Sequence, residues 1–177
     1  DLVEASKAST GNIPVSLAPT DLNVLLSQVC GEYQQRLEKQ VLEPVLSLGQ
    51  PSPWAMADGR LLWRVLDNLM SNICKYAMPG TRVYLTTERE GDTARMVVRN
   101  ISRYPLNISA DELTERFVRG DSSRSTEGSG LGLSIATSLM SLQGGDFRLT
   151  IDGDLFKVTL ILPAAETEKP GEMMLMG

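Results

Sequence analysis

The stretch "GRLLWRVLDNLMSNICKYAM" (residues 59–78) predicts an amphipathic helix, around which the other elements of the chain are arranged. Its apolar residues recur three and four positions apart, so they lie on one side of the helix and form a stripe that faces a core. Asp58 precedes the stretch as an N-cap, and the "PG" at 79–80 ends it. The stripe consists of Leu62, Val65, Leu66, Leu69 and Ile73.

On the N-terminal side of this helix, the sequence predicts strands and one further helix. Residues 13–17 alternate as a short strand, and Thr20 is placed to cap a helix. Two weaker strands follow at 42–48 and 53–57, separated by the turn-forming residues "GQPSP". The stripe of the helix after Thr20 consists of Leu22, Leu26, Val29, Tyr33 and Leu37.

On the C-terminal side, two hairpins enclose a second amphipathic helix. The hairpins are predicted from strands at 81–88 and 94–100, and at 146–152 and 155–163. A short helix is expected around 110–117, and the second amphipathic helix carries Leu131, Ile135, Leu139 and Leu142. The pattern predicts an α+β fold, a two-layer α/β sandwich whose mixed, mostly antiparallel sheet carries helices on one face.

The composition suits one globular domain and excludes some classes of function. Of the 177 residues, 42% are hydrophobic and 22% charged. The net charge of -5 lacks the excess of positive charge that nucleic-acid binding uses, so we expect no nucleic-acid partner. Cys30 and Cys74 are not spaced as metal ligands or as a redox pair, and we expect reduced thiols. The chain has no histidine, which removes the commonest general base and phosphoacceptor.

The long helix also carries a polar stripe made of Arg64, Asn68, Ser71, Asn72 and Lys75. Most polar stripes are solvated faces, and that interpretation stays open. However, asparagine costs a helix interior about 0.6 kcal/mol relative to alanine, so two of them one turn apart are an unusual choice for a solvated face. Amide oxygens beside a lysine would suit a hydrated magnesium ion that carries phosphates.

The stretch "EGSGLGLSI" (127–135) places three glycines at alternate positions where a helix begins. Free N–H groups and the helix dipole make such a place an anion site. It is not a Walker loop, because Leu131–Gly132–Leu133 stands where Gly-Lys-Ser/Thr is needed, and no strand precedes it as in a dinucleotide fold. A glycine run alone is more often a turn or a close packing contact.

Three arginines, Arg116, Arg119 and Arg124, precede the glycines in an otherwise acidic chain. The planar guanidinium group binds phosphate well. Ion pairs with Glu115 and Asp121 are the alternative interpretation.

Taken together and in this order, "DNLMSNICKYA" (67–77), "ELTERFVRGD" (112–121) and "GSGLGLSIA" (128–136) resemble three motifs of one family. They are similar to the N box, F box and second glycine box of the catalytic ATP-binding domain of bacterial sensor histidine kinases. That family shares its ATPase superfamily with DNA gyrase, the ninety-kilodalton heat-shock chaperones and MutL. The resemblance covers residues 11–163 and implies a Bergerat-type ATP-binding fold, with ATP and Mg²⁺ as ligands.

The resemblance also implies roles for single residues. Asn72 matches the magnesium-binding asparagine, and Asn68 offers a second oxygen near the metal. Lys75 and Tyr76 match positions that contact phosphate and the ribose or adenine edge, and Phe117 matches the aromatic anchor of the F box. Arg119 and Arg124 lie where a mobile lid brings positive charge to the terminal phosphates. The backbone wrapping the phosphate chain is expected at Gly128, Ser129, Gly130, Leu131, Gly132 and Leu133.

One motif departs from the family pattern. Where the family has Asp-x-Gly-x-Gly, this chain has Asn100, Ser102 and Tyr104 at the three defining positions. In the family, the aspartate accepts a proton of the adenine amino group. Asn100 keeps a carbonyl acceptor but loses the charge. Weaker recognition of the base, or a differently shaped wall of the pocket, is therefore expected.

The resemblance implies phosphoryl transfer rather than hydrolysis, because Asn68 stands where hydrolysing relatives carry a glutamate base. The set expected to act in catalysis is Asn68, Asn72, Lys75, Arg119 and Arg124. The family's phosphoacceptor is a histidine on a separate dimerising helix hairpin, for onward transfer to a response regulator in a two-component system. Residues 1–10 are expected to end that hairpin, 11–163 to form the ATP-binding domain and 164–177 to be a disordered tail.

We therefore expect a cytoplasmic domain of a homodimeric sensor protein of the inner or plasma membrane, while this chain alone is monomeric and does not phosphorylate itself. Two alternatives stay open. One is a serine kinase of the anti-sigma-factor type or an ATPase of the same superfamily. The other is a pseudokinase that works as a binding module, its nucleotide site degraded at Asn100, Ser102 and Tyr104.

Overall fold

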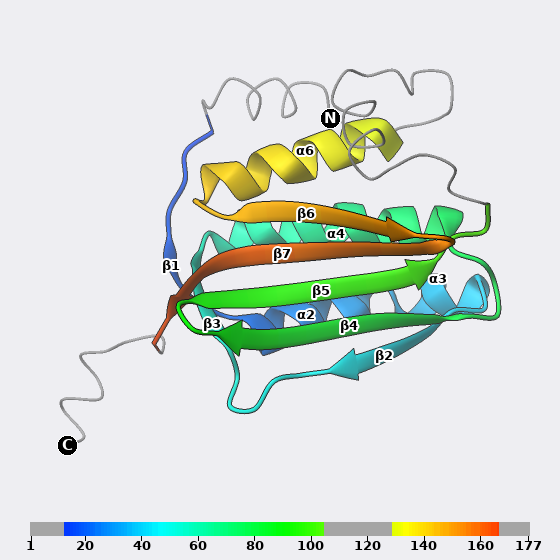
Figure 1. The fold of residues 1–177 in the computed structure, drawn as a ribbon, viewed down its shortest axis with the longest axis horizontal. Helices are drawn as coiled ribbons and strands as arrows, with labels where there is room; N and C mark the ends of the chain where they lie inside the picture. Colours follow the sequence, from blue (N-terminus) through cyan, green and yellow to red (C-terminus); the bar gives the residue numbers. More distant parts are fainter. Residues whose placement is uncertain (1–12, 105–128, 167–177) are drawn as a thin grey trace.

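The computed structural model describes residues 13–104 and 129–166, which form strands and helices interspersed along the chain (Figure 1). The strands are β1 (Ala18–Asp21), β2 (Glu43–Ser47), β3 (Trp54–Ala57), β4 (Arg82–Glu90), β5 (Thr93–Ile101), β6 (Asp146–Asp152) and β7 (Leu155–Ala165). The helices are α2 (Leu22–Glu32), α3 (Gln34–Lys39), α4 (Gly59–Tyr76) and α6 (Ser129–Leu142). Both predicted hairpins are present, and each turns at a glycine with positive φ, Gly91 and Gly153.

The strands form one sheet of seven, in the order β1-β3-β7-β5-β4-β2, with β6 also paired to β7. One edge of β7 pairs with β5 along most of its length. The other edge pairs first with β6, over Leu155–Ile161, and then with β3 at Ala164 and Ala165. All pairs are antiparallel except β2 with β4. The prediction of a mixed, mostly antiparallel sheet is confirmed.

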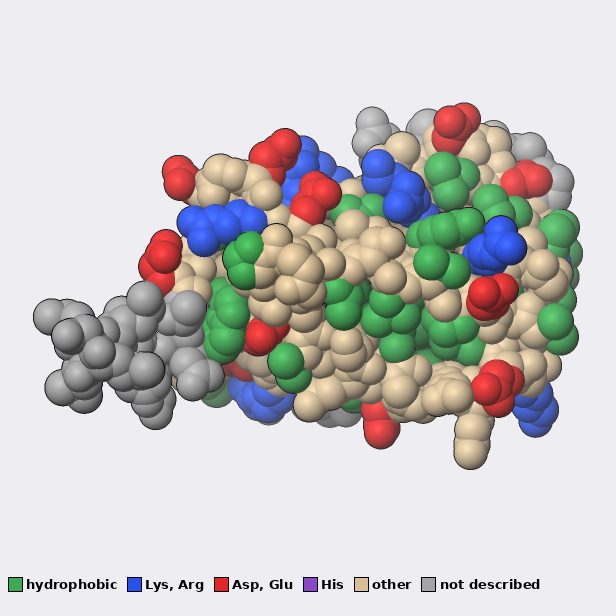
Figure 2. Space-filling view, turned by 90° about the horizontal axis from the view of Figure 1, so that it is seen from below, with side chains coloured by type: hydrophobic (Ala, Val, Ile, Leu, Met, Phe, Trp, Pro, Cys, Tyr) green, Lys and Arg blue, Asp and Glu red, His purple; other side chains and the backbone are tan. Residues whose placement is uncertain are grey.

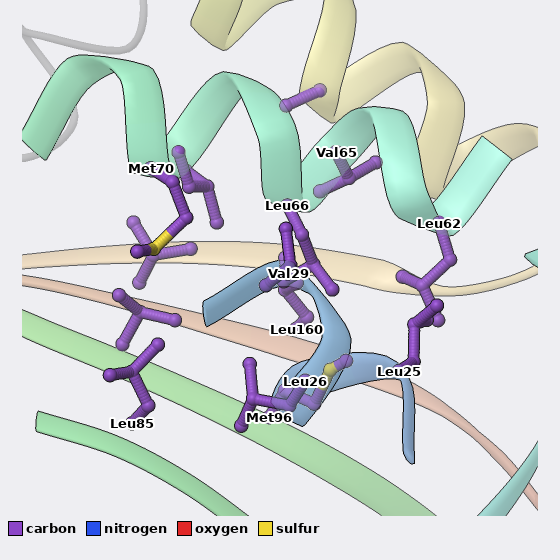
Figure 3. Packing of buried hydrophobic residues seen from close by; sticks show 14 of the residues in the cluster. Leu25, Leu26, Val29, Leu62, Val65, Leu66, Met70, Leu85, Met96 and Leu160 are labelled. Carbon is purple, nitrogen blue, oxygen red and sulfur yellow. The ribbon is translucent and has the colours of Figure 1, made fainter. Parts of the chain in front are cut away.

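Helices α2 and α4 lie behind the sheet in the view of Figure 1, and α6 lies along α4. Between the layers, Leu62, Leu66 and Met70 of α4 point toward α2 and the sheet (Figure 3). They meet Leu26 and Val29 of α2 and sheet residues such as Leu85, Met96 and Leu160. The predicted two-layer sandwich is confirmed, because a sheet and a set of amphipathic helices each bury one face against the other. No helix in the described ranges has both the length and the apolar character needed to cross a membrane.

The N-terminal elements differ from the sequence prediction in two respects. Residues 13–17 form no strand; the first strand is β1, which is shifted to Ala18–Asp21 and pairs with β3. Asp21, and not Thr20, caps α2, because its carboxylate accepts from the backbone N–H groups of Asn23 at 3.0 Å and Val24 at 3.3 Å. The cap prediction was therefore wrong by one residue.

The single helix predicted after Thr20 is two helices, because the chain breaks at Tyr33, between α2 and α3. All five residues of its predicted stripe are nevertheless buried. At the other end of the chain, β7 continues to Ala165, two residues beyond the predicted end at Pro163, because Ala164 and Ala165 find partners on β3.

Strand β2 forms an edge of the sheet and has a protected outer side. The N–H group of Glu43 donates inward, to the carbonyl oxygen of Thr81. Because main-chain groups alternate in direction along a strand, Pro44 faces outward, where it has no N–H to offer. Proline at an exposed edge is a common protection against pairing with another chain. Figure 2 shows the molecule from below, with apolar side chains gathered among charged ones of both signs.

Candidate functional site

The pairing of α4 with α6 sets the position of the candidate site. Gln143, directly after α6, is 1% exposed. Its side-chain oxygen accepts from the backbone N–H of Asp58, the N-cap of α4, at 2.9 Å. The C-terminal end of α6 is thus fixed at the start of α4, and the helices run antiparallel. Because the 14 residues of α6 extend about 21 Å, its first turn comes within about one helical turn of Asn72.

The end of β5 is fastened to the same end of α4. The N–H of Met78 donates to the carbonyl oxygen of Ile101, and that of Arg103 to the carbonyl oxygen of Tyr76, both at 2.8 Å. Ala77 and Ser102 form an isolated antiparallel bridge between these contacts. Three segments far apart in the sequence therefore meet at one end of the sandwich: the end of α4, the start of α6 and the end of β5 (Figure 1).

One side of α4 changes from apolar to polar toward this end of the sandwich. Leu61, Val65, Asn68 and Asn72 follow one another at intervals of four, three and four, which keeps them on one side of the helix. Leu61 and Val65 are buried, whereas Asn68 and Asn72 are half-buried. This side of α4 is therefore apolar in its first half and polar beside the start of α6.

The other predicted residues of α4 and β5 lie at the same end. Lys75 is exposed in the last turn of α4, and Tyr76 is half-buried beside it. Asn100 and Ser102 are both buried. Asn72, Lys75, Tyr76 and Asn100 therefore lie at this end of the sandwich, with Asn68 one turn earlier on α4, and their roles in binding stay predictions.

The first turn of α6 holds part of the predicted glycine loop. Gly130 and Gly132 lie in this turn, which contains no acidic residue. Its free N–H groups and the helix dipole favour an anion. The side chain of Leu133 packs in the core, so it has no surface to offer a ligand. Phe117, Arg119, Arg124 and Gly128 lie outside the described residues, and their roles stay predictions.

The amides of α4 suit a hard cation. The side-chain nitrogen of Asn68 is buried and has no hydrogen-bond partner within the described part of the chain. Rotation of this amide by a half turn about the Cβ–Cγ bond exchanges the positions of its nitrogen and its oxygen. The oxygen is a ligand that Mg²⁺ accepts. Asn72 offers a second amide one turn further on. The residues present therefore fit a magnesium ion that keeps most of its water ligands.

A contact that the sequence did not predict lies beside this stripe. The hydroxyl of Tyr33 donates to the carboxylate of Asp67 at 2.5 Å, and the guanidinium group of Arg36 lies 4.7 Å from the centre of the Tyr33 ring. Burial, together with the hydrogen bond to Asp67, holds the pKa of Tyr33 well above its usual range. Asp67 is the only carboxylate of α4, and this contact holds it on Tyr33. Nothing in the local pattern marks this pair, because 34 residues separate its members.

The sandwich, with the amides of α4 and the first turn of α6 toward one end of it, suits a nucleotide-binding domain. The chain belongs to the family of histidine kinase-, DNA gyrase B- and HSP90-like ATPases, whose sequence profile matches residues 57–166. This membership makes it an ATP-binding domain, as the three motifs predicted.

Curated relatives of the chain are sensor proteins. It is 36% identical over 109 residues to the probable sensor protein PcoS of Escherichia coli, covering 59% of this chain and 23% of that protein. It is 31% identical over 168 residues to the sensor protein VanSC of Enterococcus gallinarum, covering 93% of this chain and 46% of that protein. The chain thus spans less than half the length of either relative.

A solved structure has the same fold. The full-length protein ShkA, solved in complex with AMPPNP, superposes with a TM-score of 0.78 and 26% identity. The match covers 96% of this chain and 35% of the ShkA chain. The predicted Bergerat-type architecture is confirmed.

Proposed function

We propose that this chain is the catalytic domain of a sensor histidine kinase, which binds Mg·ATP and transfers the γ-phosphate to a histidine outside this sequence. The observation that carries the proposal is the meeting of the α4 amides, the first turn of α6 and Asn100 at one end of the sandwich. The similarity to the sensor proteins PcoS and VanSC, and to ShkA with its bound AMPPNP, supports it. The response regulator, the dimeric full-length protein and its place at a membrane are parts of the same proposal.

In this site, each group has a defined task. Asn72 and Asn68 hold the magnesium ion, which neutralises charge on the phosphates when bound. Lys75 is exposed next to them, where its ammonium group can reach a phosphate oxygen. The N–H groups in the first turn of α6 donate to the phosphate chain. Catalysis then consists of positioning and charge neutralisation, which suffice for phosphoryl transfer.

The arrangement favours transfer to a protein over hydrolysis. Hydrolysis needs a base that draws a proton from water, and neither amide of the stripe can do so. The one carboxylate on α4, Asp67, accepts a hydrogen bond from the hydroxyl of Tyr33 and is held there. An ATPase would therefore need a base from outside α4.

Binding of Mg·AMPPNP, followed by isothermal titration calorimetry, tests the site. We expect Asn72→Ala to weaken binding by about tenfold to a hundredfold in Mg²⁺, a range typical of disturbed metal sites. In EDTA the variant and the parent chain should bind alike, because the lost group acts through the metal. Gln35→Ala, which removes an exposed amide on α3, is the matched control and should change nothing. Equal binding by the parent chain and Asn72→Ala in Mg²⁺ would contradict the role of Asn72.

Mass spectrometry of the full-length gene product after exposure to ATP tests the reaction. A phosphorylated histidine is the expected result, and this chain alone should stay unlabelled because it contains no histidine. Phosphoserine would favour the alternative of a serine kinase. Steady release of inorganic phosphate would favour the alternative of an ATPase. Failure of the chain to bind nucleotide would favour the pseudokinase module.

A further inference from the structure

Asn100 carries a buried amide near the end of β5. The residue is 6% exposed and continues the alternation of Ala94, Met96 and Val98, which directs these side chains toward the helix layer. Within the described ranges, no hydrogen bond engages its side-chain amide. An amide at such a position can offer a donor and an acceptor to a ligand that enters at this end of the sandwich.

The surroundings of Asn100 are those of a site for a flat heterocycle. Its direct neighbour across the sheet is Phe156 of β7, and Val98 precedes it on the same face. Ser102, the next buried polar residue, uses its hydroxyl oxygen to accept from the N–H of Tyr104 at 3.2 Å. The amide of Asn100 thus lies beside apolar walls, at the end of the sandwich where α4 ends and α6 begins.

The chemistry of an amide differs from that of a carboxylate at such a place. An amide both donates and accepts, whereas an ionised carboxylate only accepts. The edge of adenine presents an amino donor at C6 and an acceptor at N1; the edge of a 6-oxopurine presents an oxygen acceptor at C6 and an N–H donor at N1. A half turn of the amide therefore allows two hydrogen bonds to either edge, whereas a carboxylate repels the 6-oxo group.

We propose that Asn100 makes this domain tolerant of both purine edges, so that it binds 6-oxopurine triphosphates as well as ATP. The inference rests on the proposed function, since it takes the base to lie against Asn100. It assigns to Asn100 the role of the residue that determines base specificity.

Inosine triphosphate is the sharpest probe, because it differs from ATP only at C6 and N1 of the base. Calorimetric titration in Mg²⁺ at pH 8 should give affinities for the two nucleotides within about tenfold of each other. Asn100→Asp should keep ATP binding and weaken inosine triphosphate by about tenfold or more, because its carboxylate faces the 6-oxo group. Gln28→Glu, an exposed amide-to-carboxylate change on α2, is the matched control and should leave the ratio unchanged.

Asn100→Ala gives an independent measurement if the buried carboxylate prevents folding. It should weaken both nucleotides by the same factor, because it removes a partner that both of them use. Strong ATP binding with inosine triphosphate weaker by far more than tenfold in the parent chain would overturn the inference. So would a ratio that neither substitution alters. If the parent chain bound neither nucleotide, the proposed function itself would fail.

Discussion

At the scale of single residues, Val41 has a backbone conformation that a β-branched residue rarely adopts. Its φ is +58°, in the left-handed region. It follows the C-cap of α3 in a Schellman motif, in which the N–H of Leu42 donates to the carbonyl oxygen of Leu37 at 2.9 Å. Glycine is usual at this position, and Val41 is 63% exposed, so its side chain gains little from packing.

We expect Val41→Gly to stabilise the protein by about 0.5–1 kcal/mol. Relief of the left-handed strain is worth about 1–2 kcal/mol, and the greater freedom of glycine in the unfolded chain offsets about 0.4–1 kcal/mol of that. Urea unfolding measures the difference. Val24→Gly, also at an exposed valine but within α2, should destabilise by about 0.5 kcal/mol or more. The same sign for both substitutions would refute the explanation.

At the scale of elements, a buried polar network fastens the β2–β3 connection to α2 and β4. The side-chain nitrogen of Asn23 donates to the carbonyl oxygen of Gly49 at 2.9 Å and to the hydroxyl of Ser52 at 3.0 Å. The hydroxyl of Thr87 donates to the amide oxygen of Asn23 and accepts from the N–H of Gly49 at 2.8 Å. Each of these polar atoms has a partner, which is the condition under which a buried network stabilises a fold.

We expect Thr87→Val to destabilise by about 2 kcal/mol or more. The substitution keeps the shape of the side chain but leaves the Asn23 oxygen and the Gly49 N–H without partners, each at a cost of about 1–3 kcal/mol. Thr86→Val, next along β4 on the opposite face, is the control, with an expected change within about 0.5 kcal/mol. If urea unfolding gave equal losses of unfolding free energy for the two variants, the network would contribute nothing specific to stability.

At the scale of the whole molecule, one core joins the helices to the sheet, and both cysteines lie in it. Cys30 belongs to α2 and Cys74 to α4, and both thiols are free and buried. Burial raises the pKa of Cys30 to about 11 and also raises that of Cys74, where Arg36 opposes the shift. Because the folded state holds the thiol proton more tightly, this contribution to stability is present below the unfolded pKa and lost as pH rises through about 11.

A thiol reagent at pH 8 should therefore label neither cysteine in the folded protein, because both thiols are buried and protonated. Labelling should require global unfolding and proceed at the same rate at Cys30 and Cys74 in single-cysteine variants. Its rate should rise with denaturant along the global unfolding curve. Much faster labelling of Cys74 would instead show that α4 opens locally. The protein would then unfold as more than one cooperative unit.

The sequence by itself determined the elements that depend on local pattern. The spacing of Leu62, Val65 and Leu66 specified α4, Asp58 specified its start, and glycine turns specified both hairpins, because periodicity and turn chemistry are properties of adjacent residues. The three motifs also predicted a set of site residues, whose roles stay predictions. Thr20 was wrong as a cap because serine, threonine and aspartate are all suitable caps, and only the observed hydrogen bonds distinguish Thr20 from Asp21.

Only the tertiary structure decided which ends of these elements meet. The bond between Asp58 and Gln143 joins residues 85 positions apart and sets the antiparallel pairing of α4 and α6. The division of one edge of β7 between β6 and β3 and the burial of Asn100 depend likewise on contacts between distant segments. The physical reason is that local pattern fixes the direction of each side chain within its own element, whereas burial and hydrogen-bond partners depend on how the elements pack together.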